Sequence, residues 1–262
     1  MMSVESELAA ADRLRREHAA RLPFSALAVE QRQDMNFALA VQDVSIRRWL
    51  EAGHVVAGWK IGLTSKRMQD MCGVAEPVMG AILGGGVRSS PARLRCADHG
   101  RLGLETELAV RLGSVPGPGE PSDAQALYSR VDGFAAAFEV IDDRNADYAA
   151  LDACSLVADN SWNAGVILGE ARTMEPDASL LGRMGRLSCN GAPAGEGLTD
   201  AAGGDPLLVV SWLISALRAR GRSLQPGQWV LTGSVMPTVF PKPGETYRFE
   251  IDGFAPIEAI IE

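Results

Sequence analysis

The 262-residue chain lacks several features that would place it in a familiar class. It has no run of about 18 or more apolar residues, so the sequence predicts no membrane span. Its N-terminal stretch "MMSVESELAAADRLRREHAARL" is amphipathic and lacks the apolar core of a signal peptide. Basic residues number 25 against 33 acidic ones, giving a formal net charge of −8, which argues against nucleic acid as a partner.

Cysteine, histidine and the common nucleotide motifs are also scarce. The four cysteines are far apart and form no CxxC pair, so we expect reduced thiols in a cytoplasmic protein. The three histidines show no metal-ligand spacing. No P-loop, GxSxG or GxGxxG motif occurs, and the sequence therefore does not support phosphate-loop, serine-hydrolase or dinucleotide-binding functions.

The chain does contain a helical beginning followed by many strands. Helical patterning covers residues 5–20 and 29–52, and a third helix over 205–221 has Asp205 as a suitable N-cap. Apolar stretches that are typical of strands include 54–63, 102–112, 133–142, 164–170, 228–234, 246–252 and 254–261.

These patterns predict the α+β class rather than a regular βαβ alternation. We expect a mainly helical segment, residues 1–63, on a β-rich body of mixed-sheet or roll type, residues 64–262. Residues 75–101 are rich in Gly, Pro and Ser, so we expect them to form loops.

Two carboxylates interrupt the apolar strand "GRLGLETELAVRLG". Glu105 and Glu107 are at positions i and i+2, so they share one face with Cα atoms roughly 6.5–7 Å apart. If buried without a counter-ion they would repel each other, and Mg²⁺ or Mn²⁺ would relieve that repulsion. The alternative is a half-exposed strand whose acids are solvated.

A third acid and a lysine strengthen the prediction of a metal site. Glu139 is the only charge within the apolar run "AAAFEVI", where a solvated face is hard to explain. Together with Glu105 and Glu107 it could bind a divalent ion and leave positions open for substrate. Lys60, in "VVAGWKIGLTS", is either an edge lysine that reaches solvent or a proton-transfer group. In the second case burial and a nearby metal would lower its pKa.

Several blocks occur in an order that is shared with a known enzyme family. They are "GWKIGLTSKRMQDMCGVAEP", "LGLETELAVRLG", "FEVIDDRNADY", "VADNSWNAGVILGE", "LTGS" and "PKPGETYRFEIDG". With them, the chain from about residue 29 onward resembles the 2-keto-4-pentenoate hydratase / 4-oxalocrotonate decarboxylase family, within the fumarylacetoacetate hydrolase superfamily. The resemblance implies a β-rich α+β body, homo-oligomers, a Mg²⁺ or Mn²⁺ site, and small 2-oxo or 2-hydroxy-dienoic acids as substrates.

The resemblance also assigns roles to individual residues. By motif, metal binding falls to the three acids named above, and catalysis falls to Lys60, which also contacts substrate. The block "LTGS" matches a substrate-contacting turn, which comprises Thr232, Gly233 and Ser234.

The chain departs from the hydratase pattern in two blocks. Hydratases of this family usually have an acid after the "EP" pair, whereas this chain has Val78, as decarboxylase-like members tend to. The block "NSWNAG" places Trp162 and Asn163 where small polar residues are usual, and Asn163 is a candidate substrate contact. Both departures bear on whether simple water addition is the reaction.

The predicted function is a metal-dependent hydratase that adds water to a dienoic acid, giving a 4-hydroxy-2-oxo acid in aromatic-compound catabolism. One alternative is a decarboxylase of the 4-oxalocrotonate type, in which Arg144 could pair with a distal substrate carboxylate. A salt bridge from Arg144 to Asp142 or Asp143 is an equally reasonable role. Another alternative, an acylpyruvate-type C–C hydrolase, usually employs a histidine, and His54 is the only candidate near Lys60 in the sequence. The complete set of acids argues against a non-catalytic binding protein.

Overall fold

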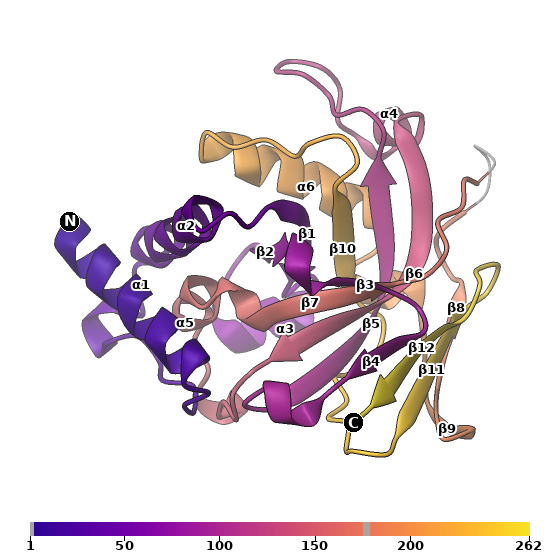
Figure 1. Ribbon diagram of the computed structural model, residues 1–262. Coiled ribbons are helices and arrows are strands. Elements are labelled where there is room, and N and C mark those ends of the chain that lie inside the picture. The colour runs from indigo at the N-terminus through magenta and orange to yellow at the C-terminus, as the bar shows by residue number, and fades with distance from the viewer. Residues whose placement is uncertain (1–2, 175–178) are drawn as a thin grey trace.

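The computed structural model describes residues 3–174 and 179–262, and it shows a helical layer, a large curled sheet and a smaller second sheet (Figure 1). The helical layer holds the N-terminal residues and lies at one end of the large sheet. The arrangement confirms the predicted α+β class. The α-helices are α1 (Val4–Ala19), α2 (Met35–Glu51), α3 (Lys66–Cys72), α4 (Ala124–Tyr128), α5 (Ala153–Ala158) and α6 (Pro206–Ala219).

The second helix starts later than the sequence predicts. A helix over 29–52 was expected, but α2 begins only after Asp34, whose side chain accepts a hydrogen bond from the Phe37 N–H. A short 3₁₀ turn, η1 (Val29–Gln31), precedes it. Helix α6 starts where predicted, because Asp205 caps it.

The large sheet, sheet A, contains the strands that carry the candidate site. In spatial order they are β2 (Val78–Leu83), β1 (Val56–Gly62), β10 (Trp229–Ser234), β5 (Leu102–Leu112), β6 (Val131–Asp142), β7 (Asn163–Leu168) and β3 (Val87–Ser89). Strands β1 and β10 are parallel, as are β3 and β7, and the other neighbours are antiparallel.

Sheet A curls until its two sides meet. Ile82 of β2, Ala109 of β5 and Val166 of β7 belong to one buried apolar cluster, although β2 and β7 are far apart in strand order. Strands β2 and β7 accordingly lie next to each other. The sheet therefore has an enclosed inner face, and alternate residues of each strand point into it.

The second sheet, sheet B, packs against the outer face of sheet A. Phe138 of sheet A and Phe249 of sheet B are in ring contact, with centroids 5.9 Å apart. Asn190 and Gly191, which both have positive φ, form the turn between β8 (Met184–Cys189) and β9 (Ala192–Leu198). In spatial order its strands are β4 (Ala92–Leu94), β12 (Ile257–Ile261), β11 (Thr246–Ile251), β8 (Met184–Cys189) and β9 (Ala192–Leu198).

The expectation of loops over residues 75–101 was wrong in part. This segment forms β2, β3 and β4 as well as two 3₁₀ turns, η2 (Gly84–Gly86) and η3 (Cys96–Asp98). Strand β2 is buried along nearly its whole length, so it has no polar alternation that would mark it as a strand. Strands β3 and β4 have three residues each, too few for a pattern.

Strand β1 links the helical segment to the body. The predicted boundary at residue 63 groups it with the helices, and in the structure it is hydrogen-bonded between β2 and β10 in sheet A. Helices α1 and α2 pack against each other, and α2 packs on α5. The division into two domains stays a prediction.

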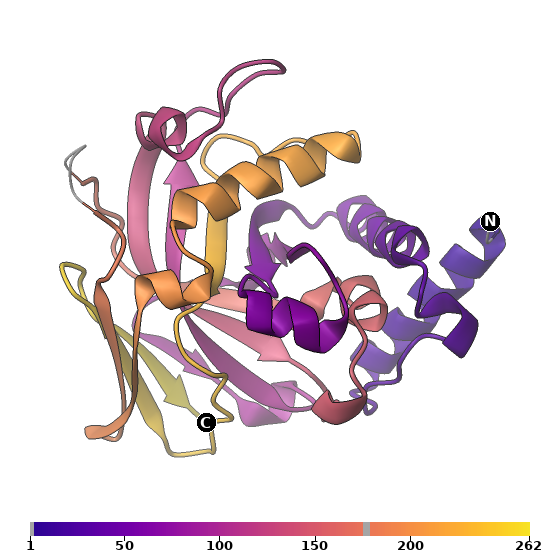
Figure 2. The same cartoon turned by 180° about the vertical axis from the view of Figure 1, so that it is seen from behind.

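Helix α6 is a core helix. The segment Thr199–Ala219, which includes α6 and the 3₁₀ turn η6 (Thr199–Ala202), is long and apolar enough by composition to cross a membrane. Such a segment is also typical of a core helix, and here Val210, Leu213 and Leu217 are fully buried in the main core. Seen from behind, α6 lies along sheet A, with α3 below it (Figure 2).

Candidate active site

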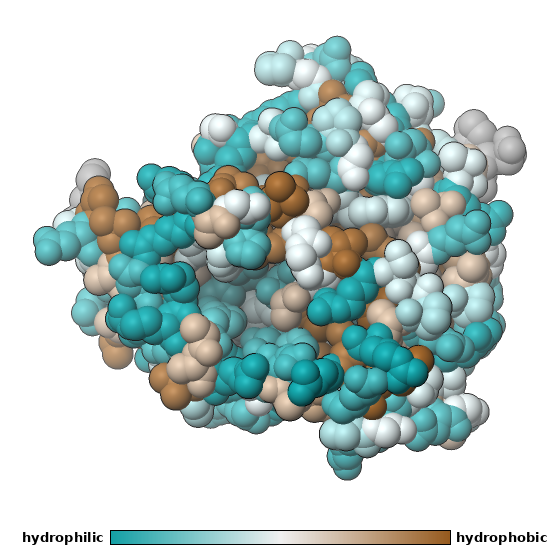
Figure 3. All heavy atoms as spheres, in the orientation of Figure 1, coloured by the Kyte–Doolittle hydropathy of each residue, from teal (hydrophilic) through white to brown (hydrophobic). Residues whose placement is uncertain are grey.

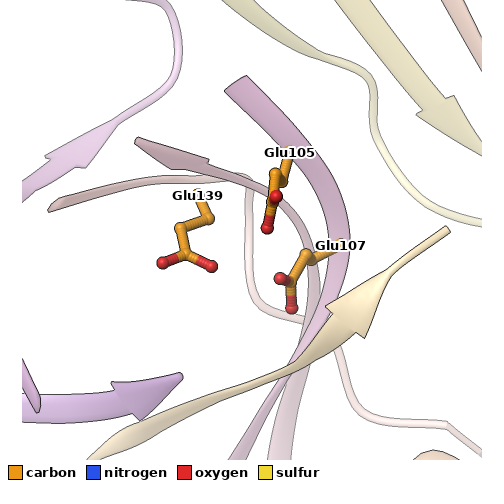
Figure 4. A group of neighbouring side chains, drawn as sticks. All are labelled: Glu105, Glu107 and Glu139. Atoms are coloured by element: carbon orange, nitrogen blue, oxygen red, sulfur yellow. The ribbon is translucent and has the colours of Figure 1, made fainter. Parts of the chain in front are cut away.

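Three carboxylates converge on the inner face of sheet A (Figure 4). Glu105 and Glu107 point to the same side of β5, as their spacing predicts, and Glu139 of β6 lies directly opposite Glu105 in the strand register. One carboxylate oxygen from each residue lies within 4.8 Å of the others. The adjacent residues on β5, such as Leu104 and Leu108, face the main core instead.

The acids are buried rather than solvated. The exposed fraction is 1% for Glu107 and 0% for Glu139, while Glu105 is half-buried. The alternative of a half-exposed strand therefore fails for two of the three. The curl of sheet A is the reason, because it turns this face inward.

One hydrogen-bond donor orients each carboxylate. The Gly233 N–H donates to Glu107 Oε2 at 2.7 Å, and the Asn163 amide donates to Glu139 Oε1 at 2.9 Å. The Thr238 hydroxyl donates to Glu105 Oε1 at 2.6 Å. These bonds leave Glu107 Oε1 buried without a hydrogen-bond partner among the described residues. Burying this oxygen without a hydrogen-bond partner costs free energy unless a cation binds to it.

Thr238 is the site residue that the sequence did not reveal. It lies outside the matched "LTGS" block, in a segment without a motif. Two backbone hydrogen bonds between Val239 and Leu104 hold that segment beside β5, which brings the hydroxyl to Glu105. A long-range backbone bridge leaves no local signal in the sequence.

Lys60 faces the acids from β1. Its Nζ lies 3.2 Å from Glu139 Oε2, and its side chain is 6% exposed. Strand β1 has a partner on each side, so Lys60 is not an edge lysine that reaches solvent. Burial by itself lowers the pKa of Lys60, but the charges of the three carboxylates outweigh burial and raise it above its ordinary value. The lowering expected from the sequence presupposes a metal that neutralises those acids.

The three carboxylates have too little positive charge around them. Burial raises the pKa of Glu107 well above its ordinary value, and the charges of Glu139 and Glu105 raise it further. Burial likewise raises the pKa of Glu139 to about 7, although Lys60 opposes the shift. One lysine cannot balance three carboxylates, and a divalent ion would supply the missing charge. The all-oxygen donor set suits Mg²⁺ or Mn²⁺.

Val78 lies beside the lysine. A Cβ added to Gly62 would lie 3.3 Å from Lys60 Nζ and 3.4 Å from Val78 Cγ2, so both side chains border the same small space. Val78 is buried in the apolar cluster that joins the body to the N-terminal helices. The group next to the ammonium at this position is therefore a hydrocarbon and not an acid.

The "LTGS" turn approaches the site mainly through its backbone. The Thr232 hydroxyl donates to the Leu108 carbonyl at 2.9 Å, and the Ser234 hydroxyl donates to the Met236 carbonyl at 2.7 Å. Gly233 has a φ of +109°, and a Cβ there would lie 2.5 Å from Thr64 Oγ1. Only a glycine lets this turn come close enough to bond Glu107. Substrate contacts by these residues stay a prediction.

Arg144 does not form the salt bridges expected from its neighbours in sequence. It is fully buried, and its guanidinium lies 2.5 Å from Asp159 and 3.6 Å from Glu17. Asp143 pairs instead with Arg101, while Asp142 accepts backbone N–H groups. Arg144 thereby ties α1 to the start of η5 (Asn160–Trp162). A role in binding a distal substrate carboxylate stays untested.

Two hollows at the surface border Asn163. A cavity of about 220 Å³ between α1, α2 and η5 is lined by His18, Asp159 and Asn163 among others. A wider one of about 580 Å³ shares His18 and Asn163 and includes Arg88 of β3. Figure 3 shows this face of the molecule hollowed beside the N-terminal helices. Asn163, which holds Glu139, thus lines both hollows.

His54 lies in another place. It is exposed and lines a cavity with Asp12 of α1 and Arg48, near the C-terminal end of α2. His54 therefore does not lie at the three carboxylates, where an acylpyruvate-type C–C hydrolase would need its histidine.

Comparisons with known proteins agree with these observations. The family model described as "Fumarylacetoacetate (FAA) hydrolase C-terminal" matches residues 82–262. The 2-keto-4-pentenoate hydratase of Paraburkholderia xenovorans (strain LB400) is 31% identical over 234 residues, which cover 87% of this chain and 85% of that protein. The 2-hydroxyhexa-2,4-dienoate hydratase of Comamonas testosteroni is 31% identical over 205 residues, covering 77% and 76%.

A solved structure shows the same fold over the whole chain. The 4-oxalocrotonate decarboxylase from Pseudomonas putida G7, complexed with magnesium and adipate, has a TM-score of 0.92 at 24% identity and covers 100% of this chain and 99% of its own. The resemblance inferred from the sequence blocks is confirmed. With the matched family model and the relatives above, the chain belongs to the fumarylacetoacetate hydrolase family.

Proposed function

We propose that the protein is a divalent-metal-dependent lyase of the hydratase type, which acts on small 2-hydroxy-dienoic or 2-oxo-enoic acids in aromatic-compound catabolism. The convergence of Glu105, Glu107 and Glu139 beside a single buried lysine carries the proposal. The relatives that are 31% identical over most of the chain are named as hydratases of such acids, which supports it.

The three glutamates would hold Mg²⁺ or Mn²⁺. When bound, the ion supplies a Lewis acid that stabilises negative charge on the 2-oxo group of the substrate. Thr238, Gly233 and Asn163 fix one oxygen of each carboxylate, so the remaining oxygens are pre-oriented.

Lys60 would move the proton. Its ammonium is held at 3.2 Å from Glu139 and borders the space next to Val78, where the carbon chain of a substrate could lie. In the proposed sequence Lys60 protonates the dienol chain as it converts to the conjugated ketone. Water then adds to that enone and gives the 4-hydroxy-2-oxo acid.

Val78 favours a second candidate function, decarboxylation of a 2-oxo-3-enedioate. A buried hydrocarbon beside Lys60 supplies no acid or base that would direct water to the substrate. In this version a distal carboxylate leaves as CO₂ while the same 2-oxo group accepts the electron pair. Both reactions need the same electron sink, so Val78 is the residue that separates them.

The test follows two substrates with Mg²⁺ and with a chelator. Freshly generated 2-hydroxypenta-2,4-dienoate and 2-oxohex-3-enedioate are supplied separately, and dienoate loss and CO₂ release are recorded together. We expect Mg²⁺-dependent loss of the monoacid without CO₂. Release of CO₂ from the diacid alone would make the protein a decarboxylase, and turnover that survives the chelator would reject the metal-dependent reaction.

The resemblance also leads us to propose a cytoplasmic homo-oligomer. The support is the relatedness of the chain to catabolic hydratases. Light scattering on the purified protein would test this, because a monomer at micromolar concentration contradicts it.

A further inference from the structure

Three consecutive residues next to the site have left-handed backbones. In η5, the φ angles of Asn160, Ser161 and Trp162 are 53°, 51° and 59°, and none of the three is glycine. Each such residue is strained relative to a right-handed conformation. All three are buried, with exposed fractions of 6% or less. A strained turn persists only where its surroundings hold it in place.

Asn160 is held as if it were part of a strand. Its side-chain Oδ1 accepts the Ala81 N–H at 2.7 Å, and its Nδ2 donates to the Ala81 carbonyl at 2.9 Å. A neighbouring strand would use the same two backbone groups of Ala81. The Ser161 hydroxyl adds a bond to the Met79 carbonyl at 3.2 Å. The turn therefore binds the free side of β2, where the curled sheet closes.

On one side, η5 contacts β2, which pairs with β1 beside Lys60. Gly80 lies opposite Lys60 in the register between β2 and β1. A Cβ at Gly80 would lie 2.5 Å from the Asn160 carbonyl oxygen and 3.2 Å from Lys60 Cγ. The Asn160 backbone, Gly80 and the lysine stem are thus stacked without space between them.

On the other side, the turn leads directly to Glu139. Asn163 follows Trp162 and donates its amide proton to Glu139 Oε1 at 2.9 Å. The Trp162 ring is fixed by edge contacts with Phe24 and Tyr148, at centroid distances of 5.3 and 5.6 Å.

We propose that Asn160 is a positioning residue, which through η5 sets the separation between the Lys60 ammonium and the Glu139 carboxylate. The turn is bonded to β2 beside Lys60 and delivers the amide that holds Glu139, so one rigid element determines both positions. The expected effect of Asn160 on turnover rests on the proposed function, whereas its effect on the distance between Lys60 and Glu139 does not. The left-handed backbone of η5 makes the Ala81 bonds and places Asn163 beside Glu139 at once.

The experiment compares Asn160→Gly with Gln42→Leu. Glycine keeps the positive φ and removes both bonds to Ala81. Gln42 of α2 is also buried and donates to the Met79 carbonyl of β2 at 2.7 Å, so its variant also loses a buried amide bond to β2 but leaves the hydrogen bonds of η5 in place. Asn160→Asp, which keeps the acceptor and tolerates this backbone, replaces the glycine variant if that one does not fold.

The readouts are the Mn²⁺ dissociation constant from calorimetry, kcat and KM, and a crystal structure of each variant. We expect the Asn160 variant to bind Mn²⁺ about tenfold more weakly. The decrease in its kcat should be larger than the increase in its KM. In its structure the distance from Lys60 Nζ to Glu139 should be longer than in the native protein. Gln42→Leu should lose thermal stability but keep native Mn²⁺ affinity.

Two results would overturn the inference. One is an unchanged Lys60–Glu139 distance in the Asn160 variant. The other is an equal loss of Mn²⁺ affinity in both variants, which would mean that any damage to β2 has the same effect. If the native protein binds no Mn²⁺, the proposed function fails, and the distance in the variant structure still decides the inference.

Discussion

Two buried ion pairs in this molecule have opposite characters. Arg144 lies 2.5 Å from Asp159, and two further charged groups lie beside them, because Glu17 is 3.6 Å from Arg144 and 2.8 Å from Arg13. Cations and carboxylates are balanced in this group. Lys60, in contrast, is 3.2 Å from Glu139 and faces two more carboxylates.

The difference distinguishes a charge cluster that is complete by itself from one that is suited to bind a cation. A balanced cluster needs nothing further and fixes α1 and η5 to each other. An unbalanced cluster of buried acids is unfavourable by itself, because at least one acid must take up a proton or a cation must be bound. Charge balance, rather than burial alone, marks the Lys60 group as the candidate site.

Glu107→Gln breaks the unbalanced group most severely. The variant loses a proposed metal ligand, so we expect turnover to fall by about 1,000-fold or more and divalent-ion binding to become undetectable by calorimetry. The metal-free variant should be at least as heat-stable as the native metal-free protein, since a repelling buried charge is gone. Glu196→Gln, an exposed change on β9, is the control. An active, metal-independent Glu107→Gln would falsify the assignment.

Arg144→Met breaks the balanced group. It leaves Asp159 buried without its main counter-charge, so we expect a loss of about 3–5 kcal/mol in the free energy of unfolding, measured by denaturant titration. The folded fraction should bind Mg²⁺ with native affinity. Arg186→Met, which removes an exposed partner of Asp252, should leave the unfolding midpoint nearly unchanged.

The same Arg144 variant tests the alternative role of this residue. If Arg144 binds a distal carboxylate, KM for a diacid should rise while KM for a monoacid stays unchanged. The bonds of Arg144 to Asp159 and Glu17 lead us to expect no such difference.

Thr238→Val tests how far orientation of a ligand matters in the unbalanced group. Without the hydroxyl, Glu105 loses the donor at 2.6 Å, and we expect Mg²⁺ affinity to fall by about tenfold. Thr238→Ser keeps the donor and should bind Mg²⁺ like the native protein. Equal affinity in the valine and serine variants would show that Glu105 needs no support.

The pH dependence of metal binding sharpens the comparison further. Burial raises the pKa of Glu139 to about 7, so this acid is largely protonated in mildly acidic metal-free protein. Protons then compete with the ion, and the Mg²⁺ dissociation constant should rise by about tenfold per pH unit below about pH 7. Affinity that stays constant from pH 8 to pH 5.5 would contradict the raised pKa values.

The stability of the metal-free protein should follow the same acids with a definite sign. Between the ordinary pKa of a glutamate and about 7, the folded state binds more protons than the unfolded state, because the pKa of Glu139 is raised on folding. Unfolding free energy should therefore decrease as pH rises through this window, and saturating Mg²⁺ should reverse the trend.

Much of the candidate site was predictable from local sequence. The period of two along β5 places Glu105 and Glu107 on one face, and a lone charge in an apolar run distinguishes Glu139 and Lys60. Thr238 and Asn160 were not predictable, since each acts through a bond to a distant strand. Arg144 was assigned wrong partners for the same reason: its nearest acids in sequence are not its nearest in space.

The sequence by itself determined the shared face of the two acids, the family and seven of the strands, namely β1, β5, β6, β7, β10, β11 and β12. Only the tertiary structure decided that this face turns inward, that Lys60 meets Glu139, and that Asn160 binds the free side of β2. The physical reason is range: side-chain alternation follows from the backbone of one strand, whereas burial and pairing depend on how the whole sheet curls.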